Sequence, residues 1–323
     1  MPIGIRPTND FAFKKTFGSE RNKTVLMSLL NSILELSLPI TDLTIENPYN
    51  ERDFQDDKLS VLDVKAADDS GAIYNIEVQL TVFDGLVQRI VFYGCEIYAD
   101  QLRAGDDYQE LRPAFSICLV DGLLWKDSQQ VHHAFVFTDR KTGRTLDETL
   151  TIHTLEFGKY NLREEEMETA SMLDCWLYWL LHAHEYEPAE LLRLFPQQQI
   201  QQATETIVRI SEITEDKAMY DAREKALRDH QWAIRQSYQE GIKEGKEEGR
   251  EEGREEGREE GREEGREEGR EEGEIKLIRT LQQILCISVS NTDELAGMNL
   301  QQLEAITAGL QERIRLRWTS SDG

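Results

Sequence analysis

The sequence predicts an α/β fold whose core is a mixed β-sheet, and three observations carry this prediction. Stretches of alternating side chains rich in Val, Ile and Leu predict strands over 59–67 and 72–80. Apolar side chains at helical spacing predict helices over 21–36 and 83–103, and the pattern is helical after residue 164. Further strands are predicted over 42–48, 114–120, 133–138 and 150–157. A helix, a group of strands, a second helix and more strands is typical of an α/β core, here followed by a helical extension.

The composition argues against several classes of protein. The 323 residues carry 37 basic and 62 acidic side chains, a net charge of −25, which does not suit sequence-blind binding of nucleic acid through bulk positive charge. No apolar run approaches the roughly 18–20 residues that cross a bilayer, and the N-terminus lacks the apolar region of a secretory signal. The four cysteines lie far apart without a CxxC pair, which argues against a structural zinc site or a disulfide framework. We therefore expect a cytoplasmic protein that does not enter membranes.

A tetrapeptide repeat divides the chain. Glycine occurs at every fourth position from Gly241 to Gly273, and the unit Gly-Arg-Glu-Glu repeats six times between Gly249 and Glu272. Between 240 and 274 the one apolar side chain is Ile242, so this stretch cannot bury a core. Each glycine costs about 1 kcal/mol in a helix relative to alanine, whereas an i,i+3 pair of opposite charge contributes only about 0.2–0.5 kcal/mol. We expect a solvated, fraying helix or a disordered spacer, with a partner-binding element as the alternative.

The predicted organisation therefore has four segments. They are a core over 1–160, a helical extension over 161–238, the repeat over 239–274 and a small helical domain over 275–318. In the last segment, apolar residues at helical spacing and a helix start at Asn291 predict two or three short helices. A bundle of about 45 residues is marginal alone, which favours docking or self-association.

The candidate chemistry lies in the hairpin predicted over 59–80. Its turn, Asp68-Asp69-Ser70-Gly71, suits a type I turn with a left-handed glycine at the fourth position. Directly opposed residues of a hairpin have Cβ atoms about 4.5–5.5 Å apart. The register that follows from this turn pairs Asp68 with Ala72, Lys65 with Asn75, Asp63 with Glu77 and Val61 with Gln79.

Two carboxylates, those of Asp63 and Glu77, thus meet on a polar face of the hairpin. Facing carboxylates repel each other, so the pKa of one of them rises unless a cation lies between them. Mg²⁺ prefers oxygen ligands, and a bound metal can activate water and stabilise phosphate charge during hydrolysis. The alternative is a solvent-facing hairpin in which Asp63 pairs with Lys65 or another cation.

The same residues carry a resemblance to a known family. Asp63, followed one hairpin later by Glu77-Val-Gln79, resembles the PD-(D/E)XK nuclease core with glutamine in place of the final lysine. More specifically, the first 160 residues resemble the Rpn family of recombination-promoting nucleases, also described as putative transposases. The matching features are Asp10-Phe-Ala-Phe13-Lys14, Phe17-Gly18, Leu62-Asp63-Val64, Asn75-Ile-Glu77-Val-Gln79, Arg89, Tyr93, Tyr98, Gly105, Tyr108, Leu111-Arg-Pro113, Glu156 and Lys159.

The resemblance implies a restriction-endonuclease-like core and a catalytic set of Asp63, Glu77 and Gln79. It implies Mg²⁺, or another divalent cation such as Mn²⁺ or Ca²⁺, held by Asp63 and Glu77. It also makes Asp10 a candidate third metal ligand, for which a helix N-cap is the alternative. Repeat-rich C-terminal tails occur in such proteins as well.

Gln79 departs from the pattern of the wider superfamily. Its neutral amide can orient a water molecule but cannot offset charge near the scissile phosphate. The predicted register puts Lys65 on the same face beside Asp63. We therefore expect Lys65 to substitute in part for the missing lysine.

Four other residues are candidates for DNA contact. Lys14 and Lys15 lie in a locally basic stretch, since residues 1–24 carry five basic and two acidic side chains; a solvated face is the alternative. Arg89 and Tyr93 are four residues apart and share a helix face after the hairpin. They are expected to clamp a phosphate or order the metal site, and a structural tyrosine beside a surface arginine is the alternative.

Two functions from different classes follow. The preferred one is a metal-dependent DNA endonuclease whose DNA breakage promotes recombination or transposition-like mobility, with toxicity or defence against foreign DNA as further roles. DNA is then the expected partner, and a homodimer is an expected assembly because nucleases that cut both strands often act in pairs. The alternative is a catalytically inactive protein of nuclease fold that binds DNA or a protein, which the missing lysine and the acidic charge favour.

Overall fold

A computed structural model describes residues 1–47, 64–146 and 149–319. The chain forms two compact units, Met1–Gln231 and Trp232–Gly323. The first contains a β-sheet with its covering helices, and the second is helical. Within the described ranges, no helix is long and apolar enough to cross a membrane.

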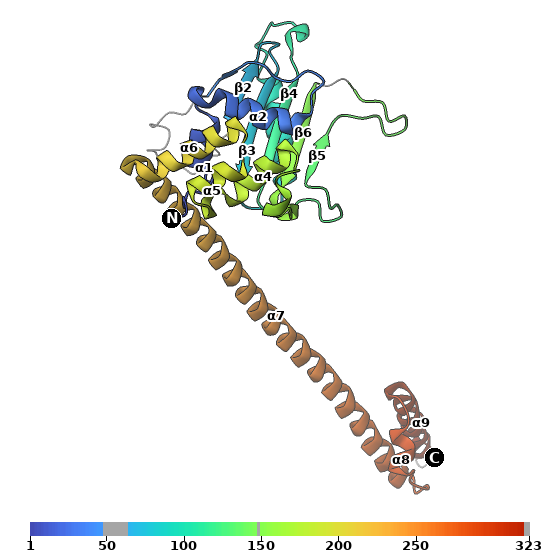
Figure 1. The fold of residues 1–323 in the computed structure, drawn as a ribbon. Coiled ribbons are helices and arrows are strands. Elements are labelled where there is room, and N and C mark those ends of the chain that lie inside the picture. Colours follow the sequence, from blue (N-terminus) through green and yellow to red (C-terminus); the bar gives the residue numbers. More distant parts are fainter. Residues whose placement is uncertain (48–63, 147–148, 320–323) are drawn as a thin grey trace. The chain divides into compact units, whose positions relative to one another are not determined.

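The first unit is built on a six-stranded mixed sheet (Figure 1). β3, β4 and β6 pair in parallel, whereas β1, β2 and β5 run antiparallel to their neighbours. Each predicted strand has a counterpart, which confirms the mixed sheet. In order across the sheet, the strands are β1 (Leu43–Ile45), β2 (Val64–Asp68), β3 (Ile73–Gln79), β4 (Ala114–Val120), β6 (Leu150–Glu156) and β5 (His132–Phe135).

Helices cover both faces of this sheet. One face shares its apolar core with α1 (Asp10–Phe17), α2 (Lys23–Leu34), α4 (Met172–His182), α5 (Pro188–Leu194) and α6 (Gln198–Glu212). The other face packs against α3 (Leu86–Ala99), through a smaller cluster that joins Leu86 and Ile90 to Cys118 and Val120. The helical extension predicted after residue 160 therefore belongs to the same core as the sheet.

The hairpin of β2 and β3 supplies part of this core, as its alternation predicts. Val64, Ala66, Tyr74 and Ile76 are at most 1 % exposed and belong to the main core cluster. Since successive side chains on a strand point to opposite faces, this apolar row turns the polar row of the hairpin toward α3.

Two predicted helices are shorter than their sequence pattern. The helix expected over 83–103 begins after Gly85, whose φ of +93° lies in the left-handed region. The helix expected over 21–36 ends at Leu34, because Glu35 is left-handed with φ +47°. A left-handed residue ends the helical hydrogen-bond pattern even where apolar periodicity continues.

The N-terminal segment is tied to the start of α7 (Thr214–Ile284). The backbone N–H of Arg6 donates to the Tyr220 hydroxyl at 3.0 Å, and Asn9 Nδ2 donates to Glu224 Oε1 at 2.9 Å. Tyr220 is 4 % exposed and lies in the main core. Residues more than 200 positions apart thus close the first unit.

Two histidines form a stacked pair on the core side of β5 and β6. His132 Nε2 and His153 Nδ1 are 2.9 Å apart, so one ring nitrogen donates and the other accepts. The ring centroids lie 5.1 Å apart. Burial, reinforced by the neighbouring His132, lowers the pKa of His153 to about 4. Burial likewise lowers the pKa of His132.

This pair predicts a loss of stability in acid. The unfolded chain binds a proton at His153 near pH 6.5, whereas the folded chain does so only near pH 4. The corresponding stability is complete above about pH 6.5 and falls by roughly 3 kcal/mol as the pH drops through this window. Urea unfolding at several pH values measures it, and the His153→Gln variant should lose a large part of the slope. An unchanged slope in that variant would assign the acid sensitivity to other groups.

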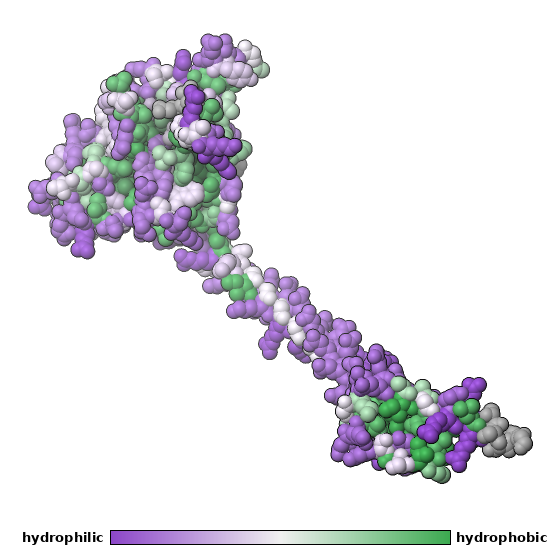
Figure 2. Space-filling view, turned by 90° about the vertical axis from the view of Figure 1, so that its right-hand side faces the viewer, coloured by the Kyte–Doolittle hydropathy of each residue, from purple (hydrophilic) through white to green (hydrophobic). Residues whose placement is uncertain are grey.

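α7 continues through the whole repeat as one helix. All residues from 240 to 270 are exposed, and nothing lies within 4 Å of a Cβ placed on the repeat glycines. Figure 2 shows this stretch as a hydrophilic rod. The solvated-helix alternative is therefore the one described. A helix that continues from both flanking segments avoids the cost of nucleation, which helps to offset its glycines.

The second unit has a small core of its own. The last part of α7 packs with α8 (Thr292–Ala296) and α9 (Leu300–Thr319), as predicted for the C-terminal segment. Asn291 caps α8 and accepts a hydrogen bond from the N–H of Asp293 at 3.3 Å. The core residues are Ile278, Leu285, Leu295, Leu303 and Leu310.

Candidate active site

The turn between β2 and β3 sets the predicted register. Gly71 adopts φ +84° and its N–H donates to the carbonyl of Asp68 at 2.9 Å. Lys65 lies opposite Asn75, as expected. The predicted partner of Glu77, Asp63, lies outside the described residues, so the carboxylate pair itself stays a prediction.

Glu77 and Asn75 share the sheet face that α3 covers. They are 5 % and 4 % exposed, although both are polar. A pocket of about 370 Å³ lies beside them. Among the described residues it is lined by Lys65, Asn75, Glu77, Tyr93, Glu96, Ile97 and Asp100.

A buried thiol lies beside the Glu77 carboxylate. The parallel register of β3 and β4 pairs Glu77 with Cys118. Burial, together with the charge of Glu77 and a hydrogen bond to it, raises the pKa of the Cys118 thiol well above its usual value. The thiol therefore stays protonated and donates to the carboxylate, which suits a supporting group and not a nucleophile.

The Asn75 side chain leaves an acceptor unmatched. Its Oδ1 is buried and has no hydrogen-bond partner in the described part of the chain. A buried polar atom without a partner calls for an explanation, and a bound water molecule or cation in the pocket supplies one. With the Glu77 carboxylate, Asn75 Oδ1 offers hard oxygen donors of the kind that Mg²⁺ prefers. Within the described ranges, which omit Asp63, no group of three or more His, Cys, Asp or Glu residues is arranged to hold a metal ion.

The side chains of Gln79 and Lys65 are each held by a contact with one neighbouring residue. Gln79 Nε2 donates to the carbonyl of Thr81 at 2.9 Å. This hydrogen bond uses the amide nitrogen, so Oε1 of the same amide points away from Thr81. Lys65 Nζ lies 3.3 Å from Glu46 Oε2, and both side chains are about one third exposed. Partly exposed pairs of this kind contribute little stability, typically about 0–1 kcal/mol. The ion pair with Glu46 therefore holds the Lys65 ammonium only weakly.

Asp10 lies at the first position of α1 and contacts α7. Asn9 caps this helix, since its Oδ1 accepts from the N–H groups of Phe11 and Ala12 at 3.1 and 3.4 Å. The N-cap alternative for Asp10 is therefore wrong by one residue. Asp10 Oδ2 lies 3.6 Å from Arg223 Nε, and burial raises the pKa of Asp10 although the guanidinium opposes this. Asp10 is not among the described residues that line the Glu77 pocket, and metal binding by it stays a prediction.

Lys14 and Lys15 do not form a solvated face. Lys14 is 3 % exposed, and Lys15 forms an ion pair with Asp216 of α7 while its ammonium lies 5.5 Å from the centre of the Phe11 ring. That alternative was based on local charge, and it is wrong because α1 packs inside the first unit. DNA contact by either lysine would require these contacts to open.

Arg89 and Tyr93 lie together on α3, as their spacing predicts. The guanidinium of Arg89 lies 5.4 Å from the centre of the Tyr93 ring, and 6.0 Å from that of Phe83. Its positive charge also acts on the Cys118 thiol, which places it near the Glu77 carboxylate. Tyr93 lines the pocket itself.

Two acidic residues of the pocket wall were missed. Glu96 and Asp100 continue the α3 stripe that begins with Arg89 and Tyr93, at steps of three and four residues. That spacing is visible in the sequence. The spacing alone does not show that these residues line the pocket, because that also depends on which face of α3 lies over the hairpin.

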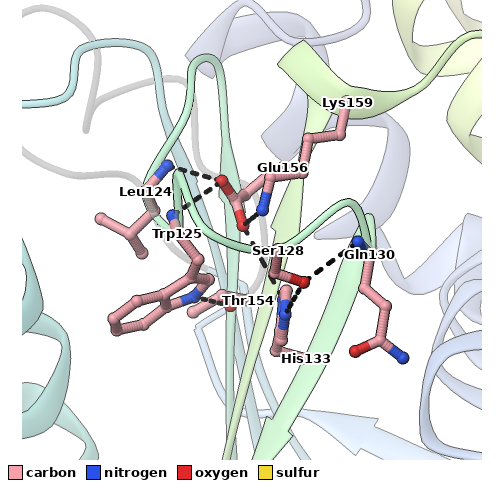
Figure 3. Close-up of polar contacts among 8 residues, drawn as sticks. All are labelled: Leu124, Trp125, Ser128, Gln130, His133, Thr154, Glu156 and Lys159. Carbon is pink, nitrogen blue, oxygen red and sulfur yellow. Dashed lines mark hydrogen bonds and ion pairs between the residues drawn. The ribbon is translucent and has the colours of Figure 1, made fainter.

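A second polar cluster was also missed, centred on Glu156 at the end of β6 (Figure 3). Strand register places Glu156 beside Val120 and Val120 beside Gln79, so all three share one row and one face. Two strand spacings separate Glu156 from Gln79, roughly 10 Å. The polar face of the hairpin thus continues across the parallel strands.

The Glu156 carboxylate is fully buried and holds a loop in place. It pairs with Lys159 Nζ at 2.6 Å, and it accepts from the N–H groups of Leu124 and Trp125 (Figure 3). His133 Nδ1 lies 3.8 Å away. These contacts fix the segment 121–131 after β4, whose first N–H donates to the carbonyl of Gln79 at 2.9 Å. Glu156 and Lys159 belong to the matching features of the resemblance, but nothing in the sequence joined them to Gln79.

The mixed sheet, with its polar hairpin beside parallel β4 and β6, is that of a PD-(D/E)XK nuclease-like core. Residues 7–237 match the family described as PD-(D/E)XK nuclease family transposase, and the chain belongs to that family. The match extends well past residue 160, in keeping with the shared core of the sheet and α4–α6. No curated protein and no solved structure was found to match the chain. The family supports a nuclease or transposase-like role.

Proposed function

We propose that this protein is a metal-dependent DNA endonuclease that hydrolyses phosphodiester bonds, and that its DNA breakage promotes recombination or transposition-like mobility. The observation that carries the proposal is the buried Glu77 in a pocket beside Lys65 and the unmatched Asn75 Oδ1. Burying a carboxylate costs free energy that hydrogen bonds or a nearby cation must offset, and a divalent ion in this pocket would be such a cation. Membership of the nuclease family supports the same chemistry.

Asp63 and Glu77 would hold the metal, with Mg²⁺ as the first choice and Mn²⁺ or Ca²⁺ as alternatives. Asp10 is kept as a third candidate ligand. Such an ion supplies a lowered pKa for a bound water molecule and positive charge beside the scissile phosphate. Asn75 Oδ1, which has no partner among the described residues, would accept a hydrogen bond from a water molecule bound in the same pocket.

Gln79 and Lys65 together replace the missing lysine: Gln79 orients the attacking water, and Lys65 supplies the positive charge. With Nε2 of Gln79 bound to Thr81, its Oε1 accepts a hydrogen bond from the attacking water and orients it. The Lys65 ammonium leaves Glu46 and approaches the negative charge that develops on the phosphate. Arg89 and Tyr93 contact the DNA backbone at the α3 side of the pocket.

Replacing Lys65 by Ala should lower the rate of cleavage about ten- to a hundredfold, because the protein loses one positive charge beside the reacting phosphate. Plasmid nicking under single-turnover conditions measures the rate. Glu46→Gln frees the same lysine and serves as the matched control, with a rate equal to or above that of the wild type. Cleavage that is unchanged in Lys65→Ala but abolished in Asp63→Ala would remove Lys65 from the mechanism.

Plasmid nicking with Mg²⁺, with EDTA and with an Asp63→Ala variant tests the function as a whole. We expect cleavage that requires the metal and disappears in the variant. Cleavage that persists in the variant would indicate a contaminating nuclease. The protein would then be the alternative, an inactive nuclease fold that binds DNA or a protein, which the neutral Gln79 favours.

A further inference from the structure

β5 leads into an exposed hairpin over residues 137–146, here called the arm (Figure 1). Thr138 and Thr145 form an antiparallel bridge, and the N–H of Leu146 donates to the carbonyl of Phe137 at 2.8 Å. The arm projects beyond the edge strand, and all its residues are exposed. It is a regular structure without a core of its own.

Asp139 fixes the shape of the arm's tip. Its carboxylate accepts from the N–H groups of Lys141 and Thr142 at 3.1 and 2.7 Å, and from the Thr142 hydroxyl at 2.7 Å. These hydrogen bonds lower the pKa of Asp139, and the one from the Thr142 hydroxyl has the largest effect. Gly143 adopts φ +69° and its N–H donates to the carbonyl of Asp139 at 2.9 Å. The Asp139 carboxylate is thus engaged in hydrogen bonds within the turn.

The tip concentrates positive charge on an acidic unit. Arg140, Lys141 and Arg144 lie within five residues that contain no acid, whereas residues 1–231 as a whole carry 23 basic and 40 acidic side chains. All three are exposed, and none forms an ion pair with another described residue. By contrast, the lysine and arginine side chains that do pair with acids in the described part of this unit include Lys15, Lys23, Lys65, Lys159, Lys217 and Arg223. Asp147 and Glu148, which follow the arm, lie outside the described residues.

We propose that the arm binds the sugar–phosphate backbone of the DNA substrate through Arg140, Lys141 and Arg144. The inference rests on the proposed nuclease function and names the element that holds the duplex. Three cations on an exposed tip match a polyanion, whose binding releases counterions. They contact phosphate and not base edges, so the arm adds affinity without sequence preference.

The distance from the arm to the Glu77 pocket suits a duplex. Three strand spacings separate β5 from β3, about 14 Å, and Phe135 lies in the same cross-strand row as Asn75. Five further residues reach the tip, at about 3.3 Å each. The tip therefore lies roughly 20–30 Å from Glu77, within one helical turn of B-DNA, which is about 34–36 Å long. A duplex cut at the pocket presents backbone at that distance.

The test is DNA binding with EDTA present, so that no cleavage occurs. The Arg140→Gln/Lys141→Gln/Arg144→Gln variant should bind a labelled duplex about tenfold or more weakly at about 0.1 M salt. Each lost phosphate contact also removes about 0.9 from the slope of log affinity against log salt, so we expect the slope to fall by about 2–3 between about 50 and 200 mM. Fluorescence anisotropy measures both quantities.

Two controls separate the arm from bulk charge. Arg193→Gln/Arg209→Gln/Lys225→Gln removes the same charge from exposed helical positions and should leave the slope nearly unchanged. Arg140→Lys/Arg144→Lys keeps the charge and should keep the slope. An arm variant with wild-type affinity and slope overturns the proposal while leaving the nuclease function intact, and loss of self-association without loss of DNA binding would assign the arm to a protein contact. Wild-type protein that binds no DNA would overturn both.

Discussion

In the Glu77→Gln variant we expect metal-dependent nicking to fall by at least about a hundredfold. The amide keeps the size and shape of the carboxylate but loses the negative charge that attracts a divalent cation. Glu77 is 5 % exposed and lies beside the Cys118 thiol. It is the one acidic residue of β3, so no other residue of that strand can supply the charge. Single-turnover nicking measures the loss of cleavage, and equilibrium binding of Mn²⁺ measures the loss of metal affinity. We expect the same variant to lose both.

Glu96→Gln is the matched control for this experiment. It makes the same chemical change on the α3 wall of the same pocket, at an exposed position. Nicking should fall much less there, because Glu96 lies on the helix and not on the hairpin. Equal losses in the two variants would mean that the pocket's total charge matters and that Glu77 is not a ligand. Full activity in Glu77→Gln would end its proposed role.

In the Lys159→Met variant we expect the unfolding free energy to fall by about 3–5 kcal/mol. The side chains of Lys159 and Glu156 are 5 % and 0 % exposed, so methionine leaves a buried carboxylate without its cation. The N–H groups of Leu124 and Trp125 remain as donors, but they cannot balance a full charge. Urea unfolding measures the change, and melting should occur at roughly 10 °C lower if the domain behaves as one of 150–250 residues.

The double variant Lys159→Met/Glu156→Gln decides whether the uncompensated charge is responsible. The neutral amide still accepts from the two backbone N–H groups, so a large part of the lost stability should return. If the double variant is no more stable than Lys159→Met, the uncompensated charge is not the cause, and the lost packing of the lysine stem explains the destabilisation.

The fold was predictable where local signals decide it. The turn Asp68-Asp69-Ser70-Gly71 contains both the left-handed glycine and its acceptor, so the pairing of Lys65 with Asn75 followed from the chain alone. Apolar alternation likewise predicted which face of the hairpin is buried. The end of α3 at Ala99 was not predictable in this way, because apolar periodicity continues to Leu102.

The candidate site was predictable only within the hairpin. The row that joins Gln79 to Glu156 depends on parallel pairing of β3, β4 and β6, which are separated by long stretches of chain. Sequence periodicity gives the faces of each strand but not the register between distant strands. The burial of Lys14 was not predicted for the same reason, since α1 packs in part against α6, and its Lys15 pairs with Asp216 of α7, both far along the chain. Asn9 and Asp10 are equally good caps by type, and only the backbone conformation separates them.

The closure of the first unit by residues 220–224 bears on protein synthesis. Arg6 and Asn9 leave the ribosome early, yet their partners Tyr220 and Glu224 follow more than 200 residues later. A nascent chain carries the polar hairpin long before its N-terminal segment can be sealed. A product that stops short of Tyr220 leaves part of the main core uncovered, and we expect it to be degraded rapidly.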